Sequence, residues 1–429
     1  MTGRSISILL GGMLLASPLL AQEALPEPPR ITLVEALETA LARSPALAQA
    51  DAQRDATAAD RLGALGAFLP SLNLTYGYQN SSTGRLDPTG AAITQESHAF
   101  QLTGNYDLFT GWQRTSDLKA AGLRLQAGNA DYREQRFATI LAVKEAYYAA
   151  LAAEDLYQVE ADRVARQEDQ LEFARRQVQL GRATLSDQLR SAVDLNNARV
   201  ALLGASNAIL QTRLALAEAV GLDETVAPAA EDTLAMTALP LTREQALALA
   251  VETSPGVQAA AASAEAARTE VAAARSSYWP SLSLGASQAW RSETFPPEDE
   301  SWSLSLTARY PLFNGLVRES SLLRARAQAD AARSVERAAV LAARTSVGAA
   351  YDQIELARAG VGLAIETVEL AREDLRVTEE RYRVGLATIL DLQSSQITLR
   401  QAEVDLIQRR FDYAIGVARL EALLGRSLP

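Results

Sequence analysis

The sequence contains two similar halves. Residues 68–72 (FLPSL) return as residues 278–282 (YWPSL), and residues 180–187 (LGRATLSD) return as residues 384–391 (VGLATILD). The first two segments are 210 residues apart and the second two are 204 apart, so the second half is about six residues shorter between them. Solenoid repeats are far shorter, about 20 to 50 residues. The chain therefore folds as a duplicated half-molecule.

The first 21 residues have the pattern of a secretory signal peptide. Arg4 supplies the positive charge, residues 6–15 form a short apolar run, and Ala21 is a small residue at the cleavage position. We expect the mature chain to begin near Gln22 with a linker over residues 22–30. No later stretch approaches the roughly 20 apolar residues of a membrane-spanning helix.

The composition argues against several classes of function. The net charge of −11 is unfavourable for nucleic-acid binding. The chain has no cysteine, which removes disulfides, thiolate metal sites and a lipoprotein anchor. Its one histidine, His98, lies in an alternating segment, whereas metal sites and catalytic triads need several convergent groups. We therefore predict no enzyme activity, no catalytic residue, no metal and no cofactor.

Each half begins with helices and continues with strands. Thr32 and Thr242 are expected helix N-caps, and Ser-Pro pairs at residues 44–45 and 254–255 interrupt both helical segments at the same place. Apolar and polar residues then alternate. This pattern predicts strands over residues 71–83, 97–109, 281–291 and 301–313, with polar loops at 80–97 and 292–300. A tilted strand of about 10 residues can cross a bilayer. A soluble sandwich with one wet face is the simpler alternative.

Long helical hairpins are predicted after the second strand of each half. No proline occurs between residues 112 and 226 or between 312 and 428, and Ala, Leu, Glu, Gln and Arg dominate. Gly181 and Gly385 mark the only repeated break, with Thr184 and Thr388 placed to cap the returning helices. The returning arms carry a heptad seam of Leu195, Leu202, Ile209 and Leu216, and of Leu399, Leu406, Tyr413 and Leu420.

Four strands cannot close a barrel in a membrane. The smallest known barrels have eight strands, and an open edge would leave backbone groups unpaired in lipid. Each chain must then donate its strands to a shared barrel, and three copies would supply twelve. The predicted fold class is mixed α and β: a long antiparallel α-helical barrel joined to a transmembrane β-barrel shared between protomers.

The order of these parts resembles the TolC-type outer membrane factors of Gram-negative bacteria. The shared motifs are the Leu-Pro-Ser-Leu entry to the first strand, Leu-Phe-x-Gly after the second, and Val-Gly-Leu-x-Thr-x-x-Asp at the helical turn, over residues 31–428. The resemblance implies a homotrimer in outer-membrane lipid with a large periplasmic portion. It also implies an exit duct of a tripartite efflux pump or type I secretion system, with a periplasmic adaptor and an inner-membrane transporter as partners.

The domain boundaries follow from the repeat. We expect repeat 1 over residues 31–221, a connector over 222–240 that adds to an equatorial belt, and repeat 2 over 241–429.

The resemblance also implies two kinds of site. The adaptor is expected to dock on the helical turns, at Leu180, Gly181, Arg182, Ala183 and Thr184, and at Val384, Gly385, Leu386, Ala387 and Thr388. A periplasmic gate is expected at Asp187, Tyr382 and Asp391. This chain departs from the family in three places: Arg182 replaces an apolar residue, Ser394 a second acidic residue, and Ala387 an arginine.

The sequence is compatible with two other classes of function. A soluble periplasmic coiled-coil adaptor or scaffold would share the hairpins but would not need detergent. A hydrolase is a distant third, because convergent catalytic residues are missing. Drug, metal and protein export are all compatible with the sequence.

Overall fold

The computed structural model describes residues 28–86, 88, 92–230 and 239–428. The expected signal peptide, most of the N-terminal linker and residues 231–238 of the connector lie outside these ranges. The elements are β1 (Arg30–Ile31), α1 (Leu33–Arg43), α2 (Pro45–Gly66), β2 (Ser71–Leu86), β3 (Ala92–Phe109), α3 (Gln113–Gln179), α4 (Leu185–Val220), β4 (Ala227–Pro228), α5 (Arg243–Thr253), α6 (Pro255–Arg275), a 3-10 turn (Ser276–Tyr278), β5 (Ser281–Ser292), β6 (Asp299–Arg309), α7 (Val317–Arg383) and α8 (Ile389–Leu424).

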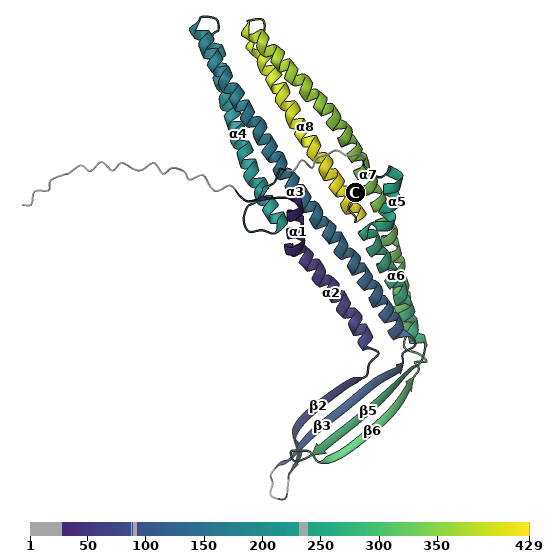
Figure 1. Cartoon of the computed structure of the whole chain (residues 1–429). Helices are drawn as coiled ribbons and strands as arrows, with labels where there is room; N and C mark the ends of the chain where they lie inside the picture. Colours follow the sequence, from purple (N-terminus) through teal and green to yellow (C-terminus); the bar gives the residue numbers. More distant parts are fainter. Residues whose placement is uncertain (1–27, 87, 89–91, 231–238, 429) are drawn as a thin grey trace, which may run out of the picture.

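The molecule is elongated, with a sheet at one end and two helical hairpin tips at the other (Figure 1). Helices α3 and α7 run from the sheet to the tips and have 67 residues each, which corresponds to about 100 Å. The returning helices α4 and α8 have 36 residues each. Equivalent positions in the two hairpins are therefore 204 residues apart, as Gln113 and Val317 are at the starts of α3 and α7.

The four long strands form one antiparallel sheet in the order β2-β3-β5-β6. Within the described residues, β2 and β6 each pair with one strand only, so both are edges. Side chains that pair across an antiparallel sheet share one face. Leu74 pairs with Leu102, Tyr76 with Phe100, and Leu304 with Ala286.

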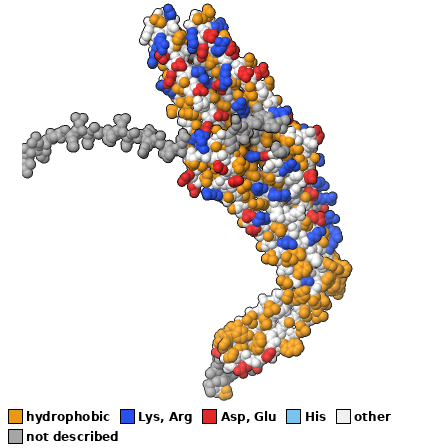
Figure 2. Space-filling view, viewed as in Figure 1, with side chains coloured by type: hydrophobic (Ala, Val, Ile, Leu, Met, Phe, Trp, Pro, Cys, Tyr) orange, Lys and Arg blue, Asp and Glu red, His pale blue; other side chains and the backbone are white. Residues whose placement is uncertain are grey.

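The predicted alternation of the strands is confirmed. One face carries mainly Leu, Ala and aromatic side chains, and the other carries Asn73, Thr103, Ser287 and Ser303. Figure 2 shows hydrophobic side chains over most of the sheet, whereas the helices display many charged ones. Leu72, Leu74, Trp302 and Leu304 are all exposed in the single chain. An exposed apolar band on a sheet is typical of a lipid-facing barrel wall.

The strand ends differ from the sequence prediction. Most of the predicted loop at 80–97 is strand, because β2 continues to Leu86 and β3 starts at Ala92. The ladder is made by backbone groups and can continue where the side chains are polar. The predicted strand 301–313 is wrong at its end, since β6 stops at Arg309. Pro311 follows two residues later and has no N–H to donate.

The helix starts agree with the sequence prediction. Thr32 and Thr242 form capping boxes with Glu35 and Gln245. The Ser-Pro pairs divide α1 from α2 and α5 from α6. The sequence does not indicate the short parallel pairing of β1 with β4, which joins the end of the N-terminal linker to the connector.

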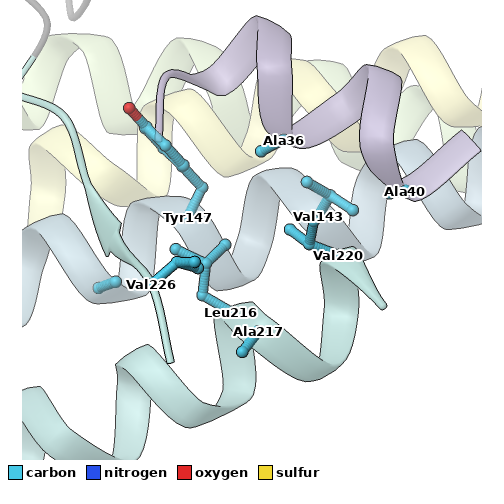
Figure 3. Close-up of a cluster of buried hydrophobic side chains, with 9 residues drawn as sticks. Ala36, Ala40, Val143, Tyr147, Leu216, Ala217, Val220 and Val226 are labelled. Atoms are coloured by element: carbon cyan, nitrogen blue, oxygen red, sulfur yellow. The ribbon is translucent and has the colours of Figure 1, made fainter. Parts of the chain in front are cut away.

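Two equivalent clusters anchor the hairpins near their middle. In the first, α1 lies across α3 and α4 and buries Ala36, Val143 and Leu216 (Figure 3). The hydroxyl of Tyr147 donates to the Ala229 carbonyl at 2.8 Å. In the second cluster α5 packs on α7 and α8 in the same way. Small residues on α1 allow this close approach of helices.

The expectation that no segment after the signal peptide is apolar enough for a membrane-spanning helix is wrong. Helix α4 is long and apolar enough, by length and composition alone, to cross a membrane, with a mean hydropathy of 1.3 in its most apolar window. Only 11% of that window is buried in the single chain. Leu203, Leu210 and Leu214 are among the exposed residues. The apolar surface of α4 thus faces outward from the protomer rather than into its core.

Candidate docking tips and periplasmic gate

The two predicted turns adopt the same backbone conformation. At the first tip Gly181 has a φ of 68°, and at the second Gly385 has a φ of 79°. The Arg182 N–H donates to the Gln177 carbonyl at 2.8 Å, and the Gly181 N–H donates to the Val178 carbonyl at 3.0 Å. These two bonds define a Schellman motif. Glycine is needed here for the positive φ, since no atom would lie within 4 Å of an added Cβ at either position.

Each returning helix starts with a capping box. The Thr184 hydroxyl accepts from the Asp187 N–H at 3.2 Å, while Asp187 Oδ2 accepts from the Thr184 N–H at 3.0 Å and from its hydroxyl at 2.8 Å. Thr388 and Asp391 repeat this arrangement. The bonds from the threonine N–H and then the hydroxyl hold the pKa of both carboxyl groups below its usual value. Both predicted caps are therefore confirmed.

The tips present apolar side chains to solvent. Leu180 is 64% exposed, Val384 70% and Leu386 70%. Exposed apolar patches on rigid turns are typical of protein contact sites. Arg182, at the position equivalent to Leu386, is also exposed and makes no ion pair within the described residues.

A groove of about 700 Å³ separates the two tips of the chain. Arg182, Ala183 and Asp187 line it from the first hairpin. Tyr382 and Arg383 line it from the second, together with Val384, Gly385, Ala387 and Thr388. The structure therefore brings most of the predicted docking residues to one groove. Leu180 and Leu386 do not line it.

Two of the three predicted gate residues lie together. Tyr382 packs its ring 5.8 Å from that of Phe173. Burial, and then the negative charge of Asp187, raises the pKa of the Tyr382 hydroxyl. The Gln170 side chain lies beside this hydroxyl and offsets part of the rise. Asp391 is exposed and lies outside this groove.

A row of polar contacts joins the two hairpins on the sheet side of the gate, and the sequence does not indicate it. Arg400 donates to Glu160 at 2.6 Å, Gln167 to Gln396 at 2.8 Å, and Arg419 to Glu145 at 3.0 Å. Lys144 with Glu421 and Gln393 with Asp194 complete the row. The partners are about 200 or more residues apart in sequence, so no local pattern pairs them. We call this row the intraprotomer polar ladder.

Within the described residues no three His, Cys, Asp or Glu side chains gather where they could hold an ion. His98 lies on β3, where its Nδ1 is 2.9 Å from the Tyr76 hydroxyl.

Comparison with known proteins places the chain among outer-membrane channels. The family model described as outer membrane efflux protein matches residues 36–222 and 246–426. Protein CyaE of Bordetella pertussis is 29% identical over 92% of this chain and 85% of its own length. Outer membrane protein TolC of Vibrio cholerae is 24% identical over 92% of this chain and 90% of its own length.

Solved structures share the fold. The chain matches CusC, described with transmembrane channel formation, at a TM-score of 0.82 with 16% identity, covering 92% of each chain. It matches the outer membrane protein VceC from Vibrio cholerae at a TM-score of 0.77 with 19% identity, covering 92% of this chain and 97% of VceC.

Proposed function

Because the chain belongs to the outer membrane efflux protein family, we propose that three copies of it assemble into one continuous duct through the outer membrane and periplasm. The chain is an outer-membrane exit duct for efflux or secretion. We further propose that the duct conducts substrate passively, without a catalytic step.

The main support for a trimer is that the four-stranded sheet has two open edges. Strands β2 and β6 are edges with one partner each within the described residues, and the exposed apolar face suits lipid. Unpaired edges are unfavourable in a bilayer because each backbone group without a hydrogen-bond partner costs several kcal/mol, as a buried unpaired polar group does. Pairing β6 of one copy with β2 of the next removes every edge. Three copies give twelve strands.

The helices are unfinished in the same way. Helix α6 packs between α3 and α7, but its counterpart α2 packs mainly on α3. The side of α2 that lacks a partner in one chain would receive α7 of a neighbour. The open sheet edges and the uncovered side of α2 would thus both be covered by the same adjacent copy of the chain.

A row on α7 supports this arrangement. Leu356, Leu363, Leu370 and Val377 recur every seven residues and are exposed. Their equivalents on α3 (Ala152, Val159, Arg166 and Phe173) are all half-buried. The α7 row would therefore face α4 of the next protomer, which presents Leu203 and Leu210. Heptad spacing on both surfaces suits long antiparallel helices.

The partners are a periplasmic adaptor and an inner-membrane transporter. The adaptor docks on the two tips, where Leu180, Val384 and Leu386 are exposed. Tyr382 and Asp187 hold the two hairpins of one protomer together below the tips, and three copies of Asp391 form an acidic ring at the narrow end.

Native mass spectrometry of the protein extracted from outer membranes in mild detergent tests the assembly. We expect three times the mass of the mature chain. A monomer that stays soluble without detergent would leave two open sheet edges, and would favour the soluble coiled-coil alternative instead.

A further inference from the structure

The groove between the two tips of one protomer is basic. Arg182 and Arg383 line it, and neither forms an ion pair within the described residues. Its one carboxylate, Asp187, already accepts two hydrogen bonds in the capping box. Arg383 also borders a second cavity that contains Glu379 and Asp169, so part of its charge is offset there. Arg182 lines only the first groove, where Asp187 is the one carboxylate.

The groove between neighbouring protomers differs at both arginine positions and at Tyr382, whereas Asp187 is matched there by Asp391. By the 204-residue equivalence of the hairpins, Leu386 takes the place of Arg182, Val178 that of Tyr382, and Gln179 that of Arg383. Arg381 and Asp391 are its charged residues, and Asp391 is close enough to Arg381 for its pKa to be lowered further by that charge. This groove is therefore apolar with balanced charges.

We propose that the intraprotomer groove binds an acidic segment, an Asp- or Glu-bearing tip of a partner's helical hairpin, whereas the interprotomer groove takes an apolar segment. The inference rests on the proposed trimer and on docking at the tips. Arginine is suited to this contact because its guanidinium donates two parallel hydrogen bonds to one carboxylate. Six grooves around the duct would then alternate between two chemistries, and a single adaptor would seat in two different ways.

Two matched positions report on the two grooves. Val384 lines the intraprotomer groove, and Leu180 is its equivalent at the other groove. Both are exposed and apolar. The photoreactive residue p-benzoylphenylalanine is introduced at one or the other in the full-length chain, in the bacterium that makes it. Cross-linked peptides are then identified by mass spectrometry. We expect the peptide captured from position 384 to be a hairpin tip with Asp or Glu, and that from position 180 to be apolar.

Charge variants then test the contact itself. Arg182→Glu is expected to lower the cross-link yield from position 384 about tenfold or more, since like charges repel across a contact. Arg182→Lys keeps the charge and is expected to keep most of the yield. Arg175→Glu is the control, because Arg175 is exposed on the same hairpin but does not line the groove.

The outcomes separate this inference from the proposed function. If a periplasmic hairpin is captured at both positions and Arg182→Glu leaves both yields unchanged, the acidic partner is wrong while docking stands. If Arg175→Glu lowers the yield as much as Arg182→Glu does, the effect is general charge and the groove is not its source. If neither position captures a hairpin, docking at the tips is overturned together with this inference.

Discussion

Arg400 on α8 donates to Glu160 on α3 at 2.6 Å, and their equivalents are Asn196 on α4 and Ala364 on α7. The equivalent positions thus lack the ion pair. The other residues of the intraprotomer polar ladder also have uncharged equivalents 204 residues away, namely Gly348, Ala349, Ala371, Thr398, Leu189, Ala192, Ala215 and Ala217. In the proposed trimer these residues, most of which are small or apolar and none of which is charged, lie at the seam between protomers. A permanent interface is favoured by close apolar packing, and a charge there without its partner would be costly.

Transplanting the ion pair tests this equivalence. Ala364→Glu places a carboxylate at the seam without a partner and is expected to weaken each interface by about 3 kcal/mol, the cost of a buried unpaired charge. Adding Asn196→Arg supplies the partner and is expected to restore the trimer. Native mass spectrometry in detergent reports the fraction of trimer.

The neutral variant Ala364→Gln separates charge from size. Ala364 is already buried against its own protomer, so a larger side chain carries a packing penalty of its own. We expect Ala364→Gln to retain more trimer than Ala364→Glu. Failure of Asn196→Arg to rescue the glutamate would show that these positions do not meet across the seam.

Adjacent residues of β6 test which face of the sheet meets lipid. Leu304 lies on the apolar face, and Ser303 lies on the opposite face with its hydroxyl 2.9 Å from that of Ser287. At a position near the bilayer midplane, Leu304→Arg is expected to destabilise the folded barrel by about 2 to 4 kcal/mol. Ser303→Arg is expected to leave assembly intact, because the lumen is wet. The measurement is the yield of heat-resistant trimer in purified outer membranes, and equal yields would contradict the assignment of the faces.

Two equivalent glycines test the neighbour at the base of the helices. Gly111 and Gly315 have φ of 62° and 67°. A Cβ on Gly111 would lie 2.5 Å from the Ser276 carbonyl oxygen, whereas one on Gly315 would meet nothing within 4 Å. Alanine at either position carries about 1 to 2 kcal/mol of backbone strain. Gly111→Ala adds the clash with the Ser276 carbonyl oxygen and is therefore expected to prevent folding of the chain.

Gly315→Ala is expected to act only on assembly. In the trimer, the end of α2 of a neighbour would cover Gly315 as Ser276 covers Gly111. Circular dichroism should show normal helix content for this variant, while native mass spectrometry shows less trimer. Normal trimer yield with Gly315→Ala would argue against that neighbour.

The parts of the fold with a local signal are predictable from the sequence. The Ser-Pro breaks, the Gly turns and the Thr caps each depend on residues within one turn of chain, and the strands show in the period of two. The extension of β2 to Leu86 is not predictable this way, because backbone pairing continues under polar side chains. The contact of Glu160 with Arg400 joins residues 240 apart in sequence and leaves no periodic trace. The turn at the first tip is predictable from the sequence, but the position of Arg383 in the groove beside that tip is not, because Arg383 belongs to the other hairpin.

The acidic ring predicts the ion selectivity of the duct. Three copies of Asp391 at a constriction would attract cations and repel anions. Asp391→Asn is expected to shift the reversal potential toward zero in planar bilayers under a salt gradient. Asp412, which is exposed on α8 far from the tip, provides the control as Asp412→Asn. An unchanged reversal potential with Asp391→Asn would place the ring outside the constriction.

The capping boxes predict how the tips respond to acid. Hydrogen bonds from the threonines lower the folded-state pKa of the Asp187 and Asp391 carboxyl groups. A carboxyl group whose pKa is lower in the folded chain than in the unfolded chain stabilises the fold. This stabilisation is present above the pKa of the unfolded chain, about 3.9 for Asp, and is lost as the pH falls through the pKa of the folded chain.

Hydrogen exchange at the first turns of α4 and α8 is the measurement. Protection there is expected to hold from neutral pH to about pH 5 and to fall below about pH 4, once exchange rates are corrected for intrinsic pH dependence. Asp187→Ala and Asp391→Ala are expected to lose protection at neutral pH and to show little further change in acid, because the titrating group is gone. Equal acid sensitivity in the wild type and in both variants would assign the effect to other carboxylates.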